Sequence, residues 1–119
     1  MSPPKNKKGE IKVEEIEELE SNETIIKKEK GDYWEKMILF MYSQRRGEYT
    51  ITDKRIIFKG FFSNFSVKYE DISSISKCNV GPMLRFIPTG ISIKTNDGKE
   101  YIMSVLGRNK YMEIIESHM

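Results

Sequence analysis

The sequence predicts a mainly β protein, with six or seven antiparallel strands followed by one C-terminal α-helix. Three patterns support this prediction. Residues 47–62 form two strand-like runs on either side of Asp53-Lys54, as in a β-hairpin. Asn96-Asp97-Gly98 is a strong hairpin turn signal between two further alternating segments. Apolar residues then recur at helical spacing in segment 108–117, at Tyr111, Met112, Ile114 and Ile115.

Length and composition fit a single soluble domain. The chain has 119 residues, of which 38% are hydrophobic and 32% charged, enough for one core. Its longest apolar run, residues 37–42, is far shorter than the roughly 20 residues of a membrane-spanning helix. Residues 1–12 contain lysines with no apolar stretch behind them, so we expect no secretory signal. Together with the single cysteine, Cys78, this favours a reducing, cytoplasmic setting.

Charge is unevenly distributed along the chain. The formal net charge is +2, but residues 1–23 carry four lysines and seven glutamates, a net charge of −3. Residues 24–119 carry a net charge of +5, which favours an anionic partner. Nucleic-acid-binding proteins usually have a larger basic excess gathered on one face, so we expect no nucleic acid partner.

The N-terminal segment is expected to lie outside the sheet. Residues 1–12 contain two prolines and a lysine cluster and are predicted to be a mobile tail, which leaves residues 13–119 as the domain. Val13, Ile16 and Leu19 are spaced three apart, which predicts a short helix over residues 13–20 with a narrow apolar stripe. Such a helix would cover an open sheet edge, or alternatively form a dimer contact.

The first strands are expected before the hairpin. Residues 24–34 have the character of extended chain, and Gly31 predicts a bulge or bend in it. Residues 37–42 are consecutively apolar and fit either a buried strand or a short helix. A strand is favoured, because the polar residues 43–47 have the composition of a turn or bulge that leads into the hairpin.

The remaining chain continues the alternation. Ser63-Asn64 predicts a turn, and residues 65–70 a strand with one solvent-exposed face. Ile72 and Ile75 are three residues apart, so a regular strand would place them on opposite faces. A strand that buries both must bend or bulge between them.

The last third of the chain is expected to form a loop, a second hairpin and the helix. Residues 79–90 are bounded by Gly-Pro and Pro-Thr-Gly sequences and predict a loop. Strands are expected at residues 91–95 and 99–106, and Gly107 ends the second of these before the helix.

The hairpin carries a string of residues that indicates a family. Tyr49, Thr52, Arg55 and Phe58 match the pattern Y-x-T-x-x-R-x-x-F, and residues 67–75 match V-x-Y-x-D-I-x-x-I. In both strings the chain resembles GRAM and bacterial pleckstrin-homology-like (PH-like) domains, over about residues 24–117. The resemblance implies a PH-like orthogonal β-sandwich or partly open barrel, with the C-terminal helix plugging one end.

Two features depart from the family pattern. The PH helix of the family carries a tryptophan, whereas the single tryptophan here, Trp34, lies in the first expected strand. The first inter-strand loop also lacks a dense lysine and arginine signature for inositol phosphate.

Groups suited to catalysis are few. His118 is the single histidine and the penultimate residue, and Cys78 has no histidine partner within the expected domain. One cysteine and one histidine do not make a zinc site, and the acidic run 14–20 lacks the glycine turn of a calcium loop. No glycine-rich phosphate-binding motif occurs. We therefore expect a protein that is not an enzyme and needs no metal or cofactor.

Three groups of residues are candidates for binding. The resemblance places a basic rim around the mouth opposite the helix, where relatives take anionic lipid headgroups. Its residues are Lys36, Arg45 and Arg46 in the first inter-strand loop and Lys59 beside the turn between the third and fourth strands. A solvated rim is the alternative. Phe61-Phe62 is either part of the core or inserts into a membrane interface. The third group is either a lid folded onto the barrel or a hydrophobic knob for a protein partner, and comprises Met83, Leu84, Arg85, Phe86 and Ile87.

These observations predict a non-catalytic binding module. The favoured partner is an anionic membrane surface, which would make the protein cytoplasmic and peripheral to the membrane. The alternative is a protein–protein interaction or oligomerisation module, in which a groove between a strand edge and the helix accepts a peptide as an added strand. A homo-oligomer is compatible with either prediction.

Overall fold

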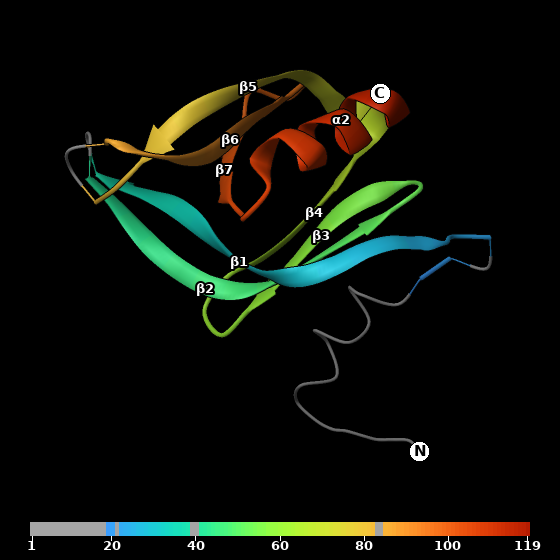
Figure 1. Cartoon of the computed structure of the whole chain (residues 1–119), viewed down its shortest axis with the longest axis horizontal. Coiled ribbons are helices and arrows are strands. Elements are labelled where there is room, and N and C mark those ends of the chain that lie inside the picture. Colours follow the sequence, from blue (N-terminus) through green and yellow to red (C-terminus); the bar gives the residue numbers. More distant parts are fainter. Residues whose placement is uncertain (1–18, 21, 39–40, 83–84) are drawn as a thin grey trace.

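The computed structural model describes residues 19–20, 22–38, 41–82 and 85–119, and these form one open antiparallel sheet of seven strands with one C-terminal helix (Figure 1). The strands are β1 (Ile25–Ile38), β2 (Met41–Thr52), β3 (Arg55–Gly60), β4 (Asn64–Lys68), β5 (Ile72–Val80), β6 (Ile87–Thr95) and β7 (Glu100–Ser104). A short 3-10 helix, η1 (Tyr69–Asp71), joins β4 to β5, and α2 (Arg108–His118) follows β7. The predicted mainly β class with a C-terminal helix is confirmed.

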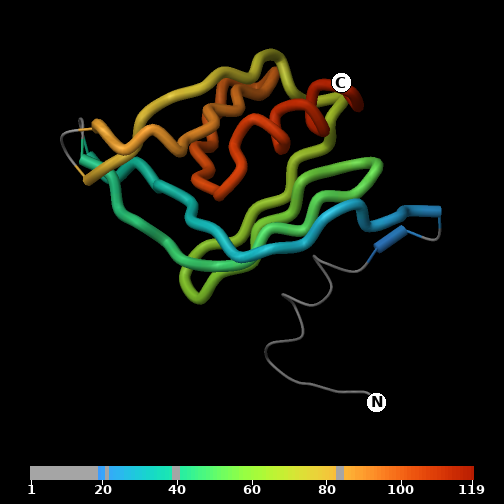
Figure 2. The backbone as a smooth tube through the Cα atoms, viewed as in Figure 1, coloured from blue at the N-terminus to red at the C-terminus, as the bar shows by residue number. Residues whose placement is uncertain are grey.

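The sheet curls around the C-terminal helix. The strand order is β4-β3-β2-β1-β7-β6-β5, with β4 and β5 at the two edges. Only two residue pairs, Asp32 with Ser104 and Tyr33 with Met103, link β1 to β7, so the sheet bends sharply at this junction. Helix α2 lies between the β1–β4 half and the β5–β7 half (Figures 1 and 2). No helix in the described part of the chain is long and apolar enough to span a bilayer.

The main core lies between the two halves of the sheet and α2. Side chains alternate along each strand, so every second residue of a strand faces inward. Gly107, at φ 72°, is the N-cap residue of α2. Tyr111 and Ile115 of this helix are fully buried. The buried members of this core come from both halves of the sheet and include Tyr49, Ile51, Ile56, Phe58, Phe65, Val67, Ile91, Ile93 and Met103.

A second, smaller core lies on the other face of the β7 half. Ile102 points away from its neighbour Met103 and packs with Trp34 and Val80, and all three are buried. Tyr42 and Cys78 pack against this cluster and are half-buried. The tryptophan that departs from the family pattern therefore belongs to a separate apolar cluster.

The first hairpin differs from the sequence prediction. Residues 43–47 were expected to form a turn or bulge, but they lie inside β2 and pair with β1 from Gly31 to Glu35. These residues are polar because their side chains contact solvent or charged residues of β1. The Gln44 side chain, for example, donates to the Asp32 carboxylate at 2.8 Å. The described residues of the apolar run 37–42 are in strands, as favoured, but they belong to two strands, because β1 ends at Ile38 and β2 begins at Met41. Met37, Ile38 and Met41 are exposed, so the expected burial is wrong.

Glycine positions explain another difference. Gly31 was expected to mark a bulge or a bend. It lies in regular register opposite Gly47, so there is no bulge at this position, and the shifts in the ladder fall at Ile25/Lys27 and Lys36/Ile38. Gly47 permits close approach of β2 and β3. A Cβ at position 47 would lie 2.4 Å from the Lys59 carbonyl oxygen and 2.6 Å from Cζ of Phe58.

The later elements are closer to expectation. A register shift between Ile72 and Ser74 confirms the predicted irregularity in β5, and Gly98, at φ 90°, confirms the predicted turn. The expected loop over residues 79–90 is too long, because β5 continues to Val80 and β6 begins at Ile87. The predicted tail over 1–12 and most of the predicted helix over 13–20 lie outside the described residues, and Leu19 and Glu20 are not helical.

Candidate functional site

The four residues of the family string are structural. Tyr49 and Phe58 are fully buried, with ring centroids 4.8 Å apart. The Tyr49 hydroxyl donates a 2.7 Å hydrogen bond to the Asp32 carbonyl, which ties β2 to the centre of β1. These two residues therefore form the core of the hairpin and are not available to a ligand.

Thr52 and Arg55 close the β2–β3 turn on a buried carboxylate. Arg55 donates to Glu23 from Nε at 3.0 Å and from Nη2 at 3.2 Å, and Thr52 Oγ1 donates to Glu23 at 2.6 Å. Burial raises the pKa of Glu23, but the hydrogen bonds from Arg55, Thr52 and the Glu20 backbone N–H outweigh burial and hold that pKa below its ordinary value. Glu23 was not among the residues singled out from the sequence. The one available signal was that a partly buried arginine such as Arg55 needs an acidic partner.

The predicted basic rim does not form a single site. Lys36, Arg45 and Arg46 were expected in a loop but lie in strands, where successive side chains point to opposite faces. Arg45 is held by an ion pair with Glu35, at 3.2 Å, and its guanidinium lies 5.8 Å from the Phe62 ring centroid. Alternation thus places Arg45 and Arg46 on different faces of β2.

Arg46 and Lys59, in contrast, come together on the outer face of the β1–β3 ladder. They line a hollow of about 560 Å³ whose other residues are Lys30, Gly47, Glu48, Gly60 and Phe61. Lys30, Glu48 and Lys59 form one cross-strand row, because Lys30 pairs with Glu48 and Glu48 with Lys59. Lys30 was not predicted as a site residue, since only the register shows that it shares a face with Lys59.

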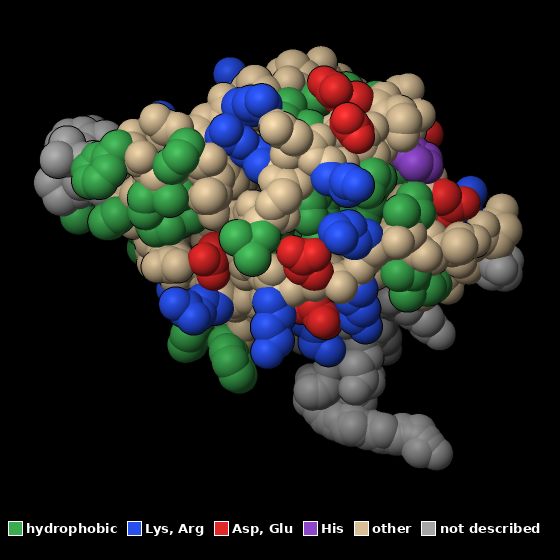
Figure 3. Space-filling model, viewed as in Figure 1, with side chains coloured by type: hydrophobic (Ala, Val, Ile, Leu, Met, Phe, Trp, Pro, Cys, Tyr) green, Lys and Arg blue, Asp and Glu red, His purple; other side chains and the backbone are tan. Residues whose placement is uncertain are grey.

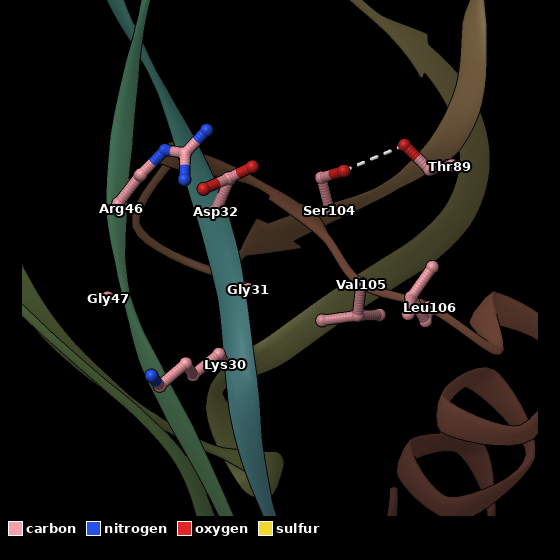
Figure 4. A pocket seen from close by; sticks show the side chains of 9 residues that line it. All are labelled: Lys30, Gly31, Asp32, Arg46, Gly47, Thr89, Ser104, Val105 and Leu106. Carbon is pink, nitrogen blue, oxygen red and sulfur yellow. Dashed lines mark hydrogen bonds between the residues drawn. The ribbon is translucent and has the colours of Figure 1, made fainter.

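A smaller hollow of about 320 Å³ adjoins the first and shares Lys30, Arg46 and Gly47 with it (Figure 4). In this hollow the Arg46 guanidinium lies beside the Asp32 carboxylate (Figure 4). The hydroxyls of Thr89 and Ser104 are 2.7 Å apart, so one donates a hydrogen bond to the other. The acidic Asp32 side chain makes this second hollow the less suitable of the two for an anion.

Phe61 and Phe62 project from the β3–β4 turn next to the larger hollow. Their exposed fractions are 95% and 84%, so they do not belong to the core, which was one of the two predicted alternatives. The Gly60 N–H donates to the Ser63 carbonyl at 3.0 Å and to the Asn64 side chain at 3.1 Å, which closes the turn tightly beneath both rings. Figure 3 shows apolar side chains projecting beside a row of Lys and Arg side chains on this side of the molecule.

A second apolar surface lies at the end of the molecule where the β1–β2 tip meets the β5–β6 connection. The Tyr42 N–H donates to the Pro82 carbonyl at 2.9 Å, and the Arg85 guanidinium lies 5.1 Å from the Tyr42 ring centroid. Phe86 is 71% exposed, so it does not fold back as a lid. Met83 and Leu84, the other apolar residues of the predicted loop, lie outside the described residues. The surface, here called the apolar end, comprises the exposed side chains of Met37, Ile38, Met41, Phe86 and Ile87.

Nucleophilic and metal-binding groups are sparse in the described ranges. Cys78 is half-buried, and burial raises the pKa of its thiol. His118 is the penultimate residue, and its ring stacks on Tyr69 with centroids 5.2 Å apart. Within the described part of the chain, no group of three His, Cys, Asp or Glu side chains is placed to hold a metal ion.

An antiparallel seven-stranded sheet that curls around a C-terminal helix is a PH-like fold, as the hairpin string suggested. Among solved structures, the chain is similar to the Vps36 N-terminal PH domain, with a TM-score of 0.55, 15% sequence identity and 83% of each chain covered. It is also similar to the C-terminal domain of an unknown protein from Leishmania infantum, with a TM-score of 0.63, 19% identity, and coverage of 82% of this chain and 85% of that one. No family model matches the sequence, and no curated protein matches it. At these identities the likeness shows the fold alone.

Proposed function

We propose that the protein is a GRAM-like, non-catalytic binding module that docks on an anionic membrane surface from the cytoplasm. The observation that carries this proposal is the β3–β4 turn, where two nearly fully exposed phenylalanine rings stand beside a hollow lined by three basic side chains. A soluble module that exposes aromatic rings next to cations has the surface chemistry of a membrane interface, where rings enter the acyl boundary and cations meet headgroups.

The magnitudes indicate weak, reversible attachment. Each lysine or arginine near an anionic surface contributes about 1 kcal/mol, and this contribution falls with salt. Full burial of a phenylalanine side chain contributes about 2 kcal/mol. Membrane attachment needs both the apolar contact of Phe61 and the charges of Lys30, Arg46 and Lys59. The turn that holds the ring beside these cations is therefore essential to the proposed mechanism.

Vesicle sedimentation tests this proposal. We expect the protein to pellet with phosphatidylcholine vesicles that contain phosphatidylserine at low salt, less at high salt, and not with phosphatidylcholine alone. Phe61→Ser with Phe62→Ser should weaken vesicle binding by about thirtyfold for each ring that inserts fully, since each ring contributes about 2 kcal/mol, and neither substitution touches the core. Lys94→Gln, on an exposed side chain of β6, is the control and should change pelleting less than twofold. Absence of pelleting with anionic vesicles at low salt would contradict the proposal.

A second candidate function, protein–protein interaction or self-association, is favoured by the apolar end. Its exposed side chains come from two segments that are far apart in sequence and meet at the Tyr42–Pro82 backbone hydrogen bond, and exposed apolar surfaces are typical of protein interfaces. Sedimentation velocity over a range of concentrations tests self-association. This role predicts a salt-tolerant dimer that Phe86→Ser disrupts and Phe61→Ser does not. A monomer at every concentration would contradict the oligomer.

A further inference from the structure

We infer that the hollow lined by Lys30, Arg46, Lys59 and Phe61 is a binding site for the phosphomonoester group of a lipid headgroup. The inference rests on the proposed membrane function and deepens it, because it names the class of headgroup and the residues that hold it. It also moves the site from the rim of the barrel mouth, where the sequence suggested it, to the outer face of β1–β3.

The charges around the hollow suit a doubly charged anion. Three cations line it together with one carboxylate, Glu48. Glu48 has a further cation close by, since Lys28 Nζ lies 4.0 Å from its carboxylate oxygen. When Lys28 and the Asp32 carboxylate beside Arg46 are also counted, four cations stand against two carboxylates, so these described side chains carry a net positive charge. A phosphomonoester carries a charge of about −1.5 to −2 at neutral pH, whereas the phosphodiester of an ordinary phospholipid carries only one negative charge.

Arg46 is the residue with the most suitable donor geometry. Its guanidinium presents a planar fork of N–H donors that pairs with two phosphate oxygens at once, and such charge-assisted pairs are the stronger class of hydrogen bond. Arg46 is exposed and stands between the two hollows. Asp32 repels an anion from the smaller hollow, so the phosphate group is expected on the Lys59 and Phe61 side of Arg46.

Phe61 points to a lipid rather than a soluble phosphate as the ligand. Its ring forms one wall of the hollow and is 95% exposed, and the ring of Phe62 stands next to it with centroids 6.4 Å apart. A soluble phosphate ester leaves both rings in water. A lipid headgroup in the hollow brings the rings against the membrane interface, where their apolar surface is buried at the same time.

Binding of the full chain to two vesicle types tests the inference. One type contains phosphatidic acid, which has a phosphomonoester headgroup, and the other contains phosphatidylserine, with mole fractions adjusted to equal surface potential. We expect about tenfold tighter binding to the phosphatidic acid vesicles, corresponding to one extra charge-assisted pair of about 1.4 kcal/mol. Arg46→Gln should remove this preference, while Lys94→Gln, which removes the same charge on β6, should leave it intact. Thermal unfolding of both variants checks that the fold is retained.

Four results would overturn the inference. Equal binding to both vesicle types, or an Arg46→Gln effect no larger than that of Lys94→Gln, would remove the headgroup site and leave the membrane function standing. Glycerol 3-phosphate that binds as tightly as the phosphatidic acid vesicles would show that the ligand is soluble. Absence of binding to either vesicle type would overturn both the site and the proposed function.

Discussion

Glu23 is the residue on which the β2–β3 turn depends most. Its side chain is fully buried and accepts hydrogen bonds from Arg55, Thr52 and the backbone of Glu20. A carboxylate in such a place is tolerated only because it is paired and hydrogen-bonded. Thr52 and Arg55 of the hairpin string are therefore explained by their contacts with Glu23, an acidic residue that precedes β1.

Glu23→Gln is expected to lower the free energy of unfolding by about 3 kcal/mol at neutral pH, because it removes the buried ionised acceptor of the Arg55 and Thr52 hydrogen bonds. The folded pKa of Glu23 is lowered, so its ionised form stabilises the fold above the unfolded pKa of about 4.3, and this stabilisation is lost as the pH falls through the folded pKa. Urea unfolding of the wild type and the variant at several pH values measures this free energy of unfolding.

The difference between wild type and Glu23→Gln should therefore shrink in acid. Glu20→Gln is the matched control, because Glu20 donates to Glu23 from its backbone N–H, which the substitution retains, and it should change stability by less than about 0.5 kcal/mol. A wild-type-to-variant difference that stays constant down to acid pH would show that the ionised pair is not the source of the stability.

Arg45 and Arg46 show how one position in a strand decides a role. They are chemically alike and adjacent, yet Arg45 is paired with Glu35 on one face while Arg46 lines the hollow on the other. The sequence prediction placed both arginines in one basic rim. The strand period separates them, which is why Arg46 and not Arg45 is the variant of choice for binding experiments.

At the scale of elements, α2 packs into the core with one face and stabilises both halves of the sheet. Its fully buried side chains, Tyr111 and Ile115, pack in the same cluster as residues of β2 and β6, whereas Ile114 is only half-buried at the edge of that cluster. A helix held in this way is stabilised by tertiary packing rather than by its intrinsic propensity.

Ile115→Ala is expected to lower the free energy of unfolding by about 3 kcal/mol, because it leaves a cavity between α2 and the strands. Ile114→Ala is the matched control on the same helix and should cost about 1 kcal/mol, since solvent fills the space it leaves. Chemical denaturation of both variants measures the difference. Equal losses would mean that α2 does not pack as described.

The β1–β2 hairpin explains the main error in the predicted elements. Residues 43–47 are polar, and polar residues between two apolar runs usually indicate a turn. Here the hairpin is long, so its polar central part is solvated and paired across the ladder by contacts such as Gln44 with Asp32. Pattern alone does not distinguish a polar strand from a turn, because the deciding partner lies about a dozen residues earlier in the chain.

At the scale of the whole molecule, two apolar clusters lie on opposite faces of the β7 half of one continuous sheet. The main core includes α2, and the smaller cluster contains Trp34, Val80 and Ile102. Since Tyr33 and Trp34 are neighbours on β1 and face different clusters, loss of β1 pairing would disrupt both at once.

The domain is therefore expected to unfold in a single cooperative transition. Fluorescence of Trp34, the single tryptophan, reports the smaller cluster, and far-ultraviolet circular dichroism reports the sheet. The two unfolding curves in urea should coincide. A tryptophan transition that precedes the loss of sheet signal would show instead that the smaller cluster melts independently of the main core.

From its periodicities, the sequence by itself determined the mainly β class, most of the strands, the Asn96–Gly98 turn and the C-terminal helix. These features depend on local spacing of apolar residues and on turn chemistry, which neighbouring residues carry. Only the tertiary structure decided that Lys30, Arg46 and Lys59 share a face, that Phe61 and Phe62 are exposed beside them, and that Glu23 is buried. Those outcomes depend on strand register and on contacts between distant segments, and no local pattern encodes either of them.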